Sequence, residues 1–274
     1  MFEYIKLEME DPLAWIILNR PEKLNAMNTQ LMDEIDQALD QLETNDRIKV
    51  IIVKGEGKAF SVGYDLDPSD YIRKKPLPID KDRKRLQRNI ERWFRIWEYP
   101  KPVIAQVHGY CIAGGSQLAL LCDMTIVSED ATFGVPSLPV GAGYIAPFWY
   151  WFIGPKKAKE AAFRPGSKIS GIEAVEMGLA NYAFSHRDLE DKTKEIALDI
   201  AKVPSDFLLI EKLAINRVME IQGFKTSLLN SAEWDTLSHA SEGVKYWTEK
   251  IRECGLKETI ELYQNSKNYW EAGL

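Results

Sequence analysis

The chain has 274 residues, of which 45% are hydrophobic and 28% charged, with a net charge of −6 and an isoelectric point near 5.3. This composition is ordinary for a globular protein with a large core. The acidic balance gives no support for nucleic-acid binding, and no apolar run approaches the roughly 18 residues that a membrane span needs. We therefore expect a cytoplasmic protein that has neither nucleic acid nor a membrane as a partner.

Apolar periodicity predicts strands and helices in alternation up to about residue 184 and helices thereafter. The predicted strands are 2–7, 14–18, 50–53, 103–107, 125–128, 131–134 and 180–184. The predicted helices are 27–42, 82–97, 116–122, 156–163, 169–178, 189–202, 206–222, 224–243, 243–255 and 256–270. Repeated strand–helix units favour an α/β fold. We expect a core over residues 1–203 and a C-terminal helical region over 204–274.

The aromatic segment 145–153 has two interpretations, a buried helix or the wall of an apolar cavity. Trp93, Trp97, Trp149 and Trp151 leave the same choice open, since they could line an apolar acyl pocket or belong to the core or an interface. The three cysteines, Cys111, Cys122 and Cys254, follow neither a C-x-x-C nor a zinc pattern. Cys111 and Cys122 are expected to be buried thiols, and no metal site is expected.

Residues 66–90 are rich in lysine and arginine and contain three prolines. A charge run of this kind is usually a solvated face. The alternative is a positive rim around a pocket that accepts a phosphorylated ligand. The cations of that rim would be Arg73, Lys74, Lys75, Lys81, Arg83, Lys84, Arg85 and Arg88.

Residues 101–123 combine a buried strand, a glycine-bearing loop and the start of a helix. Such a turn directs free backbone N–H groups at whatever lies before the helix, where the helix dipole favours negative charge. A phosphate site, an oxyanion hole and tight packing all fit this pattern.

Four ordered blocks narrow the choice: 16–26 (IILNRPEKLNA), 57–66 (GKAFSVGYDL), 108–123 (HGYCIAGGSQLALLCD) and 131–134 (ATFG). This series resembles the crotonase superfamily of enoyl-CoA hydratases and isomerases. The resemblance implies a right-handed spiral of ββα units with a C-terminal α-helical oligomerisation region. It also implies a homotrimer or a homohexamer, because in the family these helices pack between subunits.

The resemblance implies that two backbone N–H groups, those of Tyr64 and Gly114, stabilise the enolate or oxyanion of an acyl-CoA thioester. Lys23, Leu24, Ala26, Asp65 and Leu66 match the positions that contact coenzyme A. Coenzyme A would enter as part of the acyl-CoA substrate, and no permanently bound cofactor is implied.

The chain departs from the family at the two glutamates that hold water in hydratases, where it has Gln117 and Ser137. No Asp, Glu or His occurs between residues 133 and 155. Glutamine is neither an acid nor a base at physiological pH, so two-carboxylate water addition is not expected. Tyr144 resembles in spacing a tyrosine of the family's methylmalonyl-CoA decarboxylases, although these have histidine where Tyr64 stands. An ordinary aromatic of the pocket wall is the alternative for Tyr144.

The catalytic candidates are therefore Tyr64, Gly114, Gln117, Ser137 and Tyr144. The specific reaction stays open among decarboxylation, thioester hydrolysis and a non-standard hydration or isomerisation, with a lyase favoured. The alternative function is that of an acyl-CoA-binding homologue with weak or no catalysis.

Overall fold

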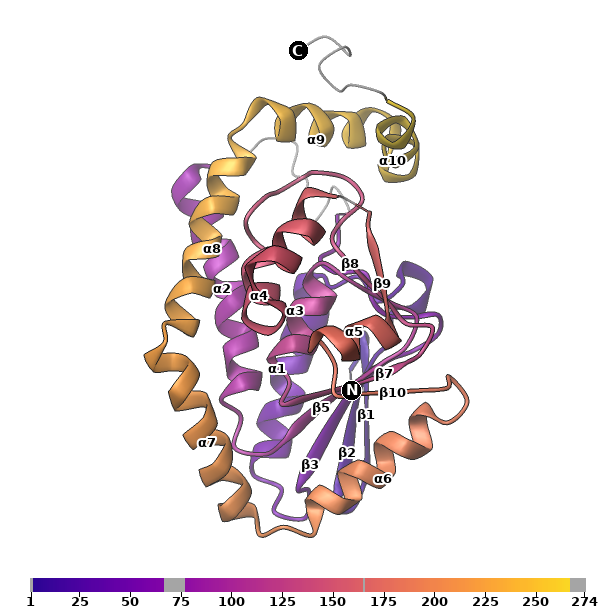
Figure 1. Ribbon diagram of the computed structural model, residues 1–274, viewed down its shortest axis with the longest axis vertical. Helices are drawn as coiled ribbons and strands as arrows, with labels where there is room; N and C mark the ends of the chain where they lie inside the picture. Colours follow the sequence, from indigo (N-terminus) through magenta and orange to yellow (C-terminus); the bar gives the residue numbers. More distant parts are fainter. Residues whose placement is uncertain (1, 67–76, 165, 267–274) are drawn as a thin grey trace.

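The computed structural model describes residues 2–66, 77–164 and 166–266 (Figure 1). Its strands are β1 (Ile5–Glu10), β2 (Leu13–Leu18), β3 (Val50–Gly55), β4 (Ala59–Ser61), β5 (Val103–Val107), β6 (Tyr110–Ile112), β7 (Met124–Ser128), β8 (Thr132–Gly134), β9 (Lys168–Ser170) and β10 (Tyr182–Phe184). Its helices are η1 (Pro21–Lys23), α1 (Thr29–Glu43), α2 (Ile79–Trp97), α3 (Gly114–Leu121), α4 (Ala146–Phe163), α5 (Gly171–Met177), α6 (Leu189–Ala201), α7 (Ser205–Ile221), α8 (Phe224–His239), α9 (Glu242–Cys254) and α10 (Leu256–Asn265).

The strands form two sheets, one in the order β1-β2-β3-β5-β7-β10 and one in the order β4-β6-β8-β9. The chain passes from the larger sheet to the smaller one and then into a helix three times, through β3–β4–α2, β5–β6–α3 and β7–β8–α4. The strands of these units pair in parallel within each sheet. The predicted α/β fold built from ββα units is therefore confirmed.

Three short strands, β4, β6 and β9, were not predicted, and the helix predicted over 169–178 begins only at Gly171 because residues 168–170 form β9. Each of these strands has only three residues, too few for an alternating pattern to register. Neighbouring strands, not their own residues, stabilise them.

The first turns of the fold follow the sequence closely. β1 and β2, both among the predicted strands, form an antiparallel hairpin with Ile5 opposite Leu18. Helix α1 buries an apolar stripe against the sheet, formed by Leu31, Ile35, Ala38, Leu39 and Leu42. Asn28, rather than Thr29, caps this helix by accepting a 2.8 Å hydrogen bond from the N–H of Leu31.

The aromatic segment 145–153 forms the first half of α4, and the helix is interrupted at Gly154, where φ is 71°. Phe148 and Trp149 are buried, whereas Tyr150 is about half exposed. Trp93, Trp97 and Trp149 belong to the main core, so the core interpretation of these tryptophans holds. The expected burial of two thiols is also confirmed: Cys111 and Cys122 are buried, and burial raises the pKa of both.

The C-terminal helices wrap around one side of the core, with α8 along α2 and with α9 and α10 at one end (Figure 1). The buried ammonium of Lys212 in α7 lies 2.8 Å from the carboxylate of Asp123, which follows α3. Several large apolar side chains of α7 and α8 point outward and are more than half exposed: Phe207, Ile210, Leu213, Ile215, Val218, Ile221, Trp234 and Leu237. Within the described part of the chain, no helix combines the length and the apolar character needed to cross a bilayer.

Candidate active site

Two loops that are far apart in the sequence are tied together at the edge of the smaller sheet. The side chain of Asn25 accepts a hydrogen bond from the N–H of Arg20 and donates to the carbonyls of Glu56 and Ala59. The guanidinium of Arg20 is buried and lies 2.8 Å from the carboxylate of Asp65. The first two sequence blocks thus form one structural unit.

Tyr64 is held in this unit by a bridge between backbone segments. The N–H of Met27 donates to the carbonyl of Gly63 at 2.8 Å, and the N–H of Asp65 donates to the carbonyl of Met27 at 3.1 Å. Backbone groups alternate in direction along an extended segment, so the N–H of Tyr64 points away from Met27.

Gly114 opens helix α3 beside the same segment. As the first helical residue it has an N–H without an acceptor in its own helix. Ala113 before it has φ 51° and ψ −121°, a conformation that is rare for a residue with a side chain. A Cβ on Gly63 would lie 2.9 Å from the backbone nitrogen of Gly114, so the two backbones touch. The predicted N–H donors of Tyr64 and Gly114 therefore come from adjacent segments.

The side chain of Gln117, in α3, is fully buried and connects two tyrosines. Its Oε1 accepts a 2.8 Å hydrogen bond from the hydroxyl of Tyr64, and its Nε2 donates to the carbonyl of Tyr144 at 2.9 Å. The indole of Trp93 donates to the Tyr64 hydroxyl at 3.0 Å, and the hydroxyl of Tyr144 donates to the carbonyl of Leu86. The structure thus brings together four of the five catalytic candidates.

Ser137 is the candidate that these contacts do not include. Its hydroxyl oxygen lies 3.4 Å from the place that a Cβ on Gly166 would take, in the segment that leads to β9. Among the described residues, no hydrogen bond joins Ser137 to Tyr64, Gln117 or Tyr144.

Both tyrosines are neutral phenols at physiological pH. Burial raises the pKa of Tyr64 to about 12, against the opposing effects of the Trp93 hydrogen bond and the charge of Arg85. Burial also raises the pKa of Tyr144 well above its ordinary value. The group around Gln117 is therefore polar but uncharged.

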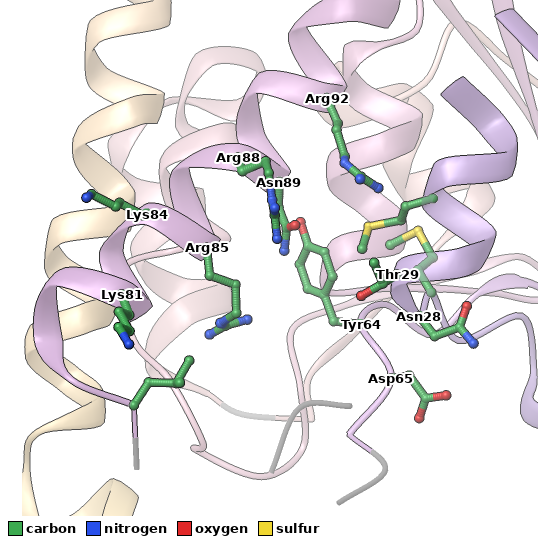
Figure 2. A pocket seen from close by; sticks show the side chains of 13 residues that line it. Asn28, Thr29, Tyr64, Asp65, Lys81, Lys84, Arg85, Arg88, Asn89 and Arg92 are labelled. Atoms are coloured by element: carbon green, nitrogen blue, oxygen red, sulfur yellow. The ribbon is translucent and has the colours of Figure 1, made fainter. Parts of the chain in front are cut away.

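A pocket of about 410 Å³ opens in front of Tyr64, between α1 and α2 (Figure 2). Cations of α2 line one wall at helical spacing, namely Lys81, Lys84, Arg85, Arg88 and Arg92. The positive rim proposed from the sequence is thus present for Lys81, Lys84, Arg85 and Arg88. Arg83 does not line the pocket and instead pairs with Glu233 at 2.8 Å. Residues 73–75 lie outside the described part of the chain.

The five residues matched to coenzyme A contact occupy different surroundings. Lys23 is exposed at the end of η1, Leu24 has a left-handed backbone with φ 51°, and Ala26 is buried. Asp65 lines the pocket with its carboxylate paired to Arg20. Leu66 packs against an apolar cluster formed by Leu138, Val140, Trp247 and Ile251.

A charged cluster next to the pocket was not predicted as a site. The ring of His239 lies 2.6 Å from the carboxylate of Asp82 through Nδ1 and 3.6 Å from that of Asp235 through Nε2. Arg85 donates to the other oxygen of Asp82 at 2.7 and 3.1 Å. Burial raises the pKa of Asp235 to about 6. Burial acts to raise the pKa of Asp82, but the hydrogen bond with His239 and the charge of Arg85 outweigh it, so the pKa is lowered.

The sequence alone predicts only the two pairs within this cluster, not the cluster itself. Asp82 and Arg85 are three residues apart, and Asp235 and His239 are four apart, so each pair shares a helix face. Only the packing of α8 on α2 joins the two pairs. Within the described chain, no group of three His, Cys, Asp or Glu residues could hold a metal ion.

Comparison with known proteins is consistent across sequence and structure. Residues 8–254 match the model of the enoyl-CoA hydratase/isomerase family. The chain is 31% identical over 226 residues to hydroxycinnamoyl-CoA hydratase-lyase of Pseudomonas fluorescens, covering 79% of each chain. It is 31% identical over 257 residues to a probable enoyl-CoA hydratase of Bacillus subtilis, covering 90% of this chain and 96% of the other.

The fold agrees with solved structures over almost the whole chain. An enoyl-CoA hydratase/isomerase from Xanthobacter autotrophicus Py2 superposes with a TM-score of 0.90 at 35% identity, covering 96% of this chain and 98% of that one. The fold is thus of the crotonase type, as expected from the four sequence blocks. The chain belongs to the enoyl-CoA hydratase/isomerase family.

Proposed function

We propose that this protein is an enzyme that binds an acyl-CoA thioester and stabilises its enolate or oxyanion with the backbone N–H groups of Tyr64 and Gly114. One observation carries the proposal: the backbone of Gly63 approaches the nitrogen of Gly114 so closely that a Cβ there would lie only 2.9 Å away. This contact places two N–H groups on adjacent segments, each without a partner in its own element. Two such donors can act on one carbonyl oxygen.

The physical effect of this pair is large enough to support catalysis. Removal of a single donor from a well-characterised oxyanion hole costs about 2.7–4 kcal/mol, or roughly 10²–10³ in rate. The uncommon backbone of Ala113 sets the direction of the Gly114 N–H. A conformation of this kind costs about 1–3 kcal/mol and persists where the surrounding structure fixes it.

The reaction that fits this site does not need a resident carboxylate. Gln117 takes the position of one hydratase glutamate, and its amide is engaged by Tyr64 and Tyr144. Decarboxylation fits because the substrate supplies its own electron pair, so that the protein needs to stabilise only the enolate. Hydrolysis and a non-standard hydration or isomerisation require the same polarised carbonyl. We favour a lyase on this ground.

The second candidate is an acyl-CoA-binding protein with weak catalysis. The observation in its favour is the same neutral surroundings of Gln117, because the described hydrogen-bond partners of its amide, a tyrosine hydroxyl and a backbone carbonyl, are not general bases. Turnover of a panel of acyl-CoA thioesters, followed by mass spectrometry, separates the two. Tight binding without product from any thioester supports this second function.

We also propose that the protein forms a homotrimer or a homohexamer. The outward-facing apolar residues of α7 support this, because monomers rarely expose a contiguous patch of such size. The cytoplasmic location expected from the sequence stays a prediction.

Infrared spectroscopy of a bound thioester tests the central proposal. Butyryl-CoA labelled with ¹³C at its carbonyl is bound to the wild type, to Gly114→Ala and to Gly114→Pro. A Cβ on Gly114 would lie 2.7 Å from the Tyr64 ring in both variants, but only proline removes the N–H. We expect the carbonyl stretch to fall on binding to the wild type and to return toward the free value in Gly114→Pro beyond any change in Gly114→Ala. Equal spectra for the two variants would count against the N–H of Gly114 as a donor.

A further inference from the structure

We propose that Arg85 binds a carboxylate on the acyl group, so that the preferred substrates are carboxyacyl-CoA thioesters. This inference rests on the proposed function and adds the chemical class of the acyl group. It concerns one side chain of the pocket wall, which differs from its neighbours in how it is held.

Arg85 lines the same pocket as Tyr64. Figure 2 shows its side chain extending from α2 into the pocket, between Lys81 and Tyr64. Its charge acts to lower the pKa of both Tyr64 and Tyr144, against the larger effect of burial. A thioester with its oxygen at the Tyr64 N–H would therefore extend its acyl group toward a fixed positive charge.

The guanidinium of Arg85 is positioned by buried groups. Its Nε and Nη2 atoms donate to one oxygen of Asp82 at 3.1 and 2.7 Å. His239 of α8 contacts the other oxygen of Asp82 at 2.6 Å, and Asp82 is buried. A guanidinium carries five N–H donors in a rigid plane, so it can bind a carboxylate while it remains bound to another. The contacts from two helices fix the orientation in which it does so.

Three of the other cations of the wall are not held in this way. Lys81, Lys84 and Arg88 are exposed, whereas the side chain of Arg85 is 21% exposed. Arg92 is held by carboxylates as Arg85 is, but its partners, Asp33 and Asp36, come from α1. Exposed, flexible cations suit long-range attraction of phosphates, whereas a fixed guanidinium suits recognition of a planar carboxylate.

The surroundings of Arg85 also favour an acid group over an alkyl chain. Most residues that line the pocket are polar or charged, and its apolar side chains are Met27, Met32 and Leu77. Gln117 is neutral where a glutamate would repel an acidic acyl group. A carboxylate near Arg85 would meet the uncharged phenol of Tyr64 and a guanidinium whose opposite side is bound to the carboxylate of Asp82.

Binding measurements with three ligands test this proposal. Free CoA, butyryl-CoA and glutaryl-CoA are titrated by calorimetry into the wild type and into Arg85→Met, Arg85→Lys, Arg88→Met and Arg83→Met. We expect the wild type to bind glutaryl-CoA at least about tenfold more tightly than butyryl-CoA, the scale of a charge-assisted hydrogen-bond pair. Arg85→Met should abolish this preference with little change for free CoA, and Arg85→Lys should restore part of it. Arg83→Met is the matched control, because Arg83 lies in the same helix but does not line the pocket.

Comparison of the affinities for the three ligands shows whether Arg85 binds the acyl carboxylate or the phosphates of CoA. If Arg85→Met weakens all three ligands equally, Arg85 contacts the CoA phosphates and the proposal is overturned. Absence of a preference for glutaryl-CoA in the wild type, together with normal binding of butyryl-CoA, also overturns it and leaves the proposed function intact. No binding of any of the three would overturn both. The affinities for succinyl-CoA and malonyl-CoA, whose acyl chains are shorter, then show which distance between the thioester and the carboxylate suits Arg85. If Arg85→Met does not fold, Asp82→Asn with Arg85→Gln keeps a neutral hydrogen-bonding pair and takes its place in every comparison.

Discussion

The hydroxyl of Tyr64 donates a 2.8 Å hydrogen bond to Oε1 of Gln117, a side chain that is fully buried. This contact joins the segment after β4 to helix α3 through a phenol and an amide. It also means that the Gln117 side chain is neutral and already engaged at both of its polar atoms. The chemistry of the site must therefore depend on groups other than this side chain.

Removal of the Tyr64 hydroxyl should affect stability more than catalysis. Tyr64→Phe keeps the backbone N–H but leaves Oε1 of Gln117 and the indole N–H of Trp93 without their partner. We expect the free energy of unfolding to fall by about 1–3 kcal/mol, measured by chemical denaturation. Turnover should fall by less than about tenfold, because the N–H donor remains. Tyr150→Phe, at an exposed tyrosine, is the control and should change neither quantity.

Restoring two carboxylates should introduce hydratase activity. Gln117→Glu combined with Ser137→Glu is expected to raise hydration of crotonyl-CoA above the wild-type level, monitored by loss of the enoyl absorbance. The new carboxyl at position 117 would face the carbonyl of Tyr144, which accepts from the amide in the wild type. No gain, in a variant that folds and still binds CoA, would show that these positions do not match the hydratase glutamates.

Asp235 should make the stability of the protein depend on pH. Burial raises its pKa from 3.8 to about 6, while His239, Arg85 and a hydrogen bond from Ala142 oppose the rise and Asp82 adds to it. Between pH 4 and 6 the folded state keeps a proton that the unfolded chain has lost, so the free energy of unfolding falls as pH rises and then levels off. Asp235→Asn removes this loss. We expect its stability relative to the wild type to increase by up to about 3 kcal/mol across that window.

Urea denaturation at pH 4.5, 5.5, 6.5 and 7.5 measures this difference. The exposed Asp191→Asn serves as the control and should follow the wild type at every pH. A constant difference between Asp235→Asn and the wild type over these conditions would contradict the assigned cause, since it would mean that the carboxyl ionises equally in both states.

A charge on the outer face of α7 should disrupt assembly. Ile210 and Ile221 are 63% and 76% exposed, and both lie on the helix that carries the outward-facing apolar residues. Ile210→Glu with Ile221→Glu is expected to shift the protein from a trimer or hexamer to a monomer in light scattering coupled to gel filtration, because a charge is costly to bury. Lys245→Glu on α9 serves as a charged control away from α7. A monomeric wild type would refute the oligomer.

The outline of the fold was accessible from the sequence. Strands such as 50–53 and 103–107 are continuous apolar runs, and the stripe of α1 recurs at helical spacing. The strands β4, β6 and β9 were missed because their pairing with neighbours across a sheet is a contribution that local residue patterns do not contain. Helix α2 begins at Ile79 rather than at Asp82, because residues after Pro78 fit either a loop or a first helical turn and the sequence does not decide between them.

The sequence by itself determined the family and the two glycine-bearing segments, because their spacing along the chain is itself the signal, and the resemblance to the family implied the ββα units. Tertiary structure decided which groups meet. Gln117 and Tyr64 are 53 residues apart and His239 and Asp82 are 157 apart, yet each pair forms a hydrogen bond. The packing of α8 on α2 likewise brings His239 to the carboxylate of Asp82, which holds Arg85. Contacts between distant segments depend on how the whole chain buries its apolar surface, and no local pattern encodes that outcome.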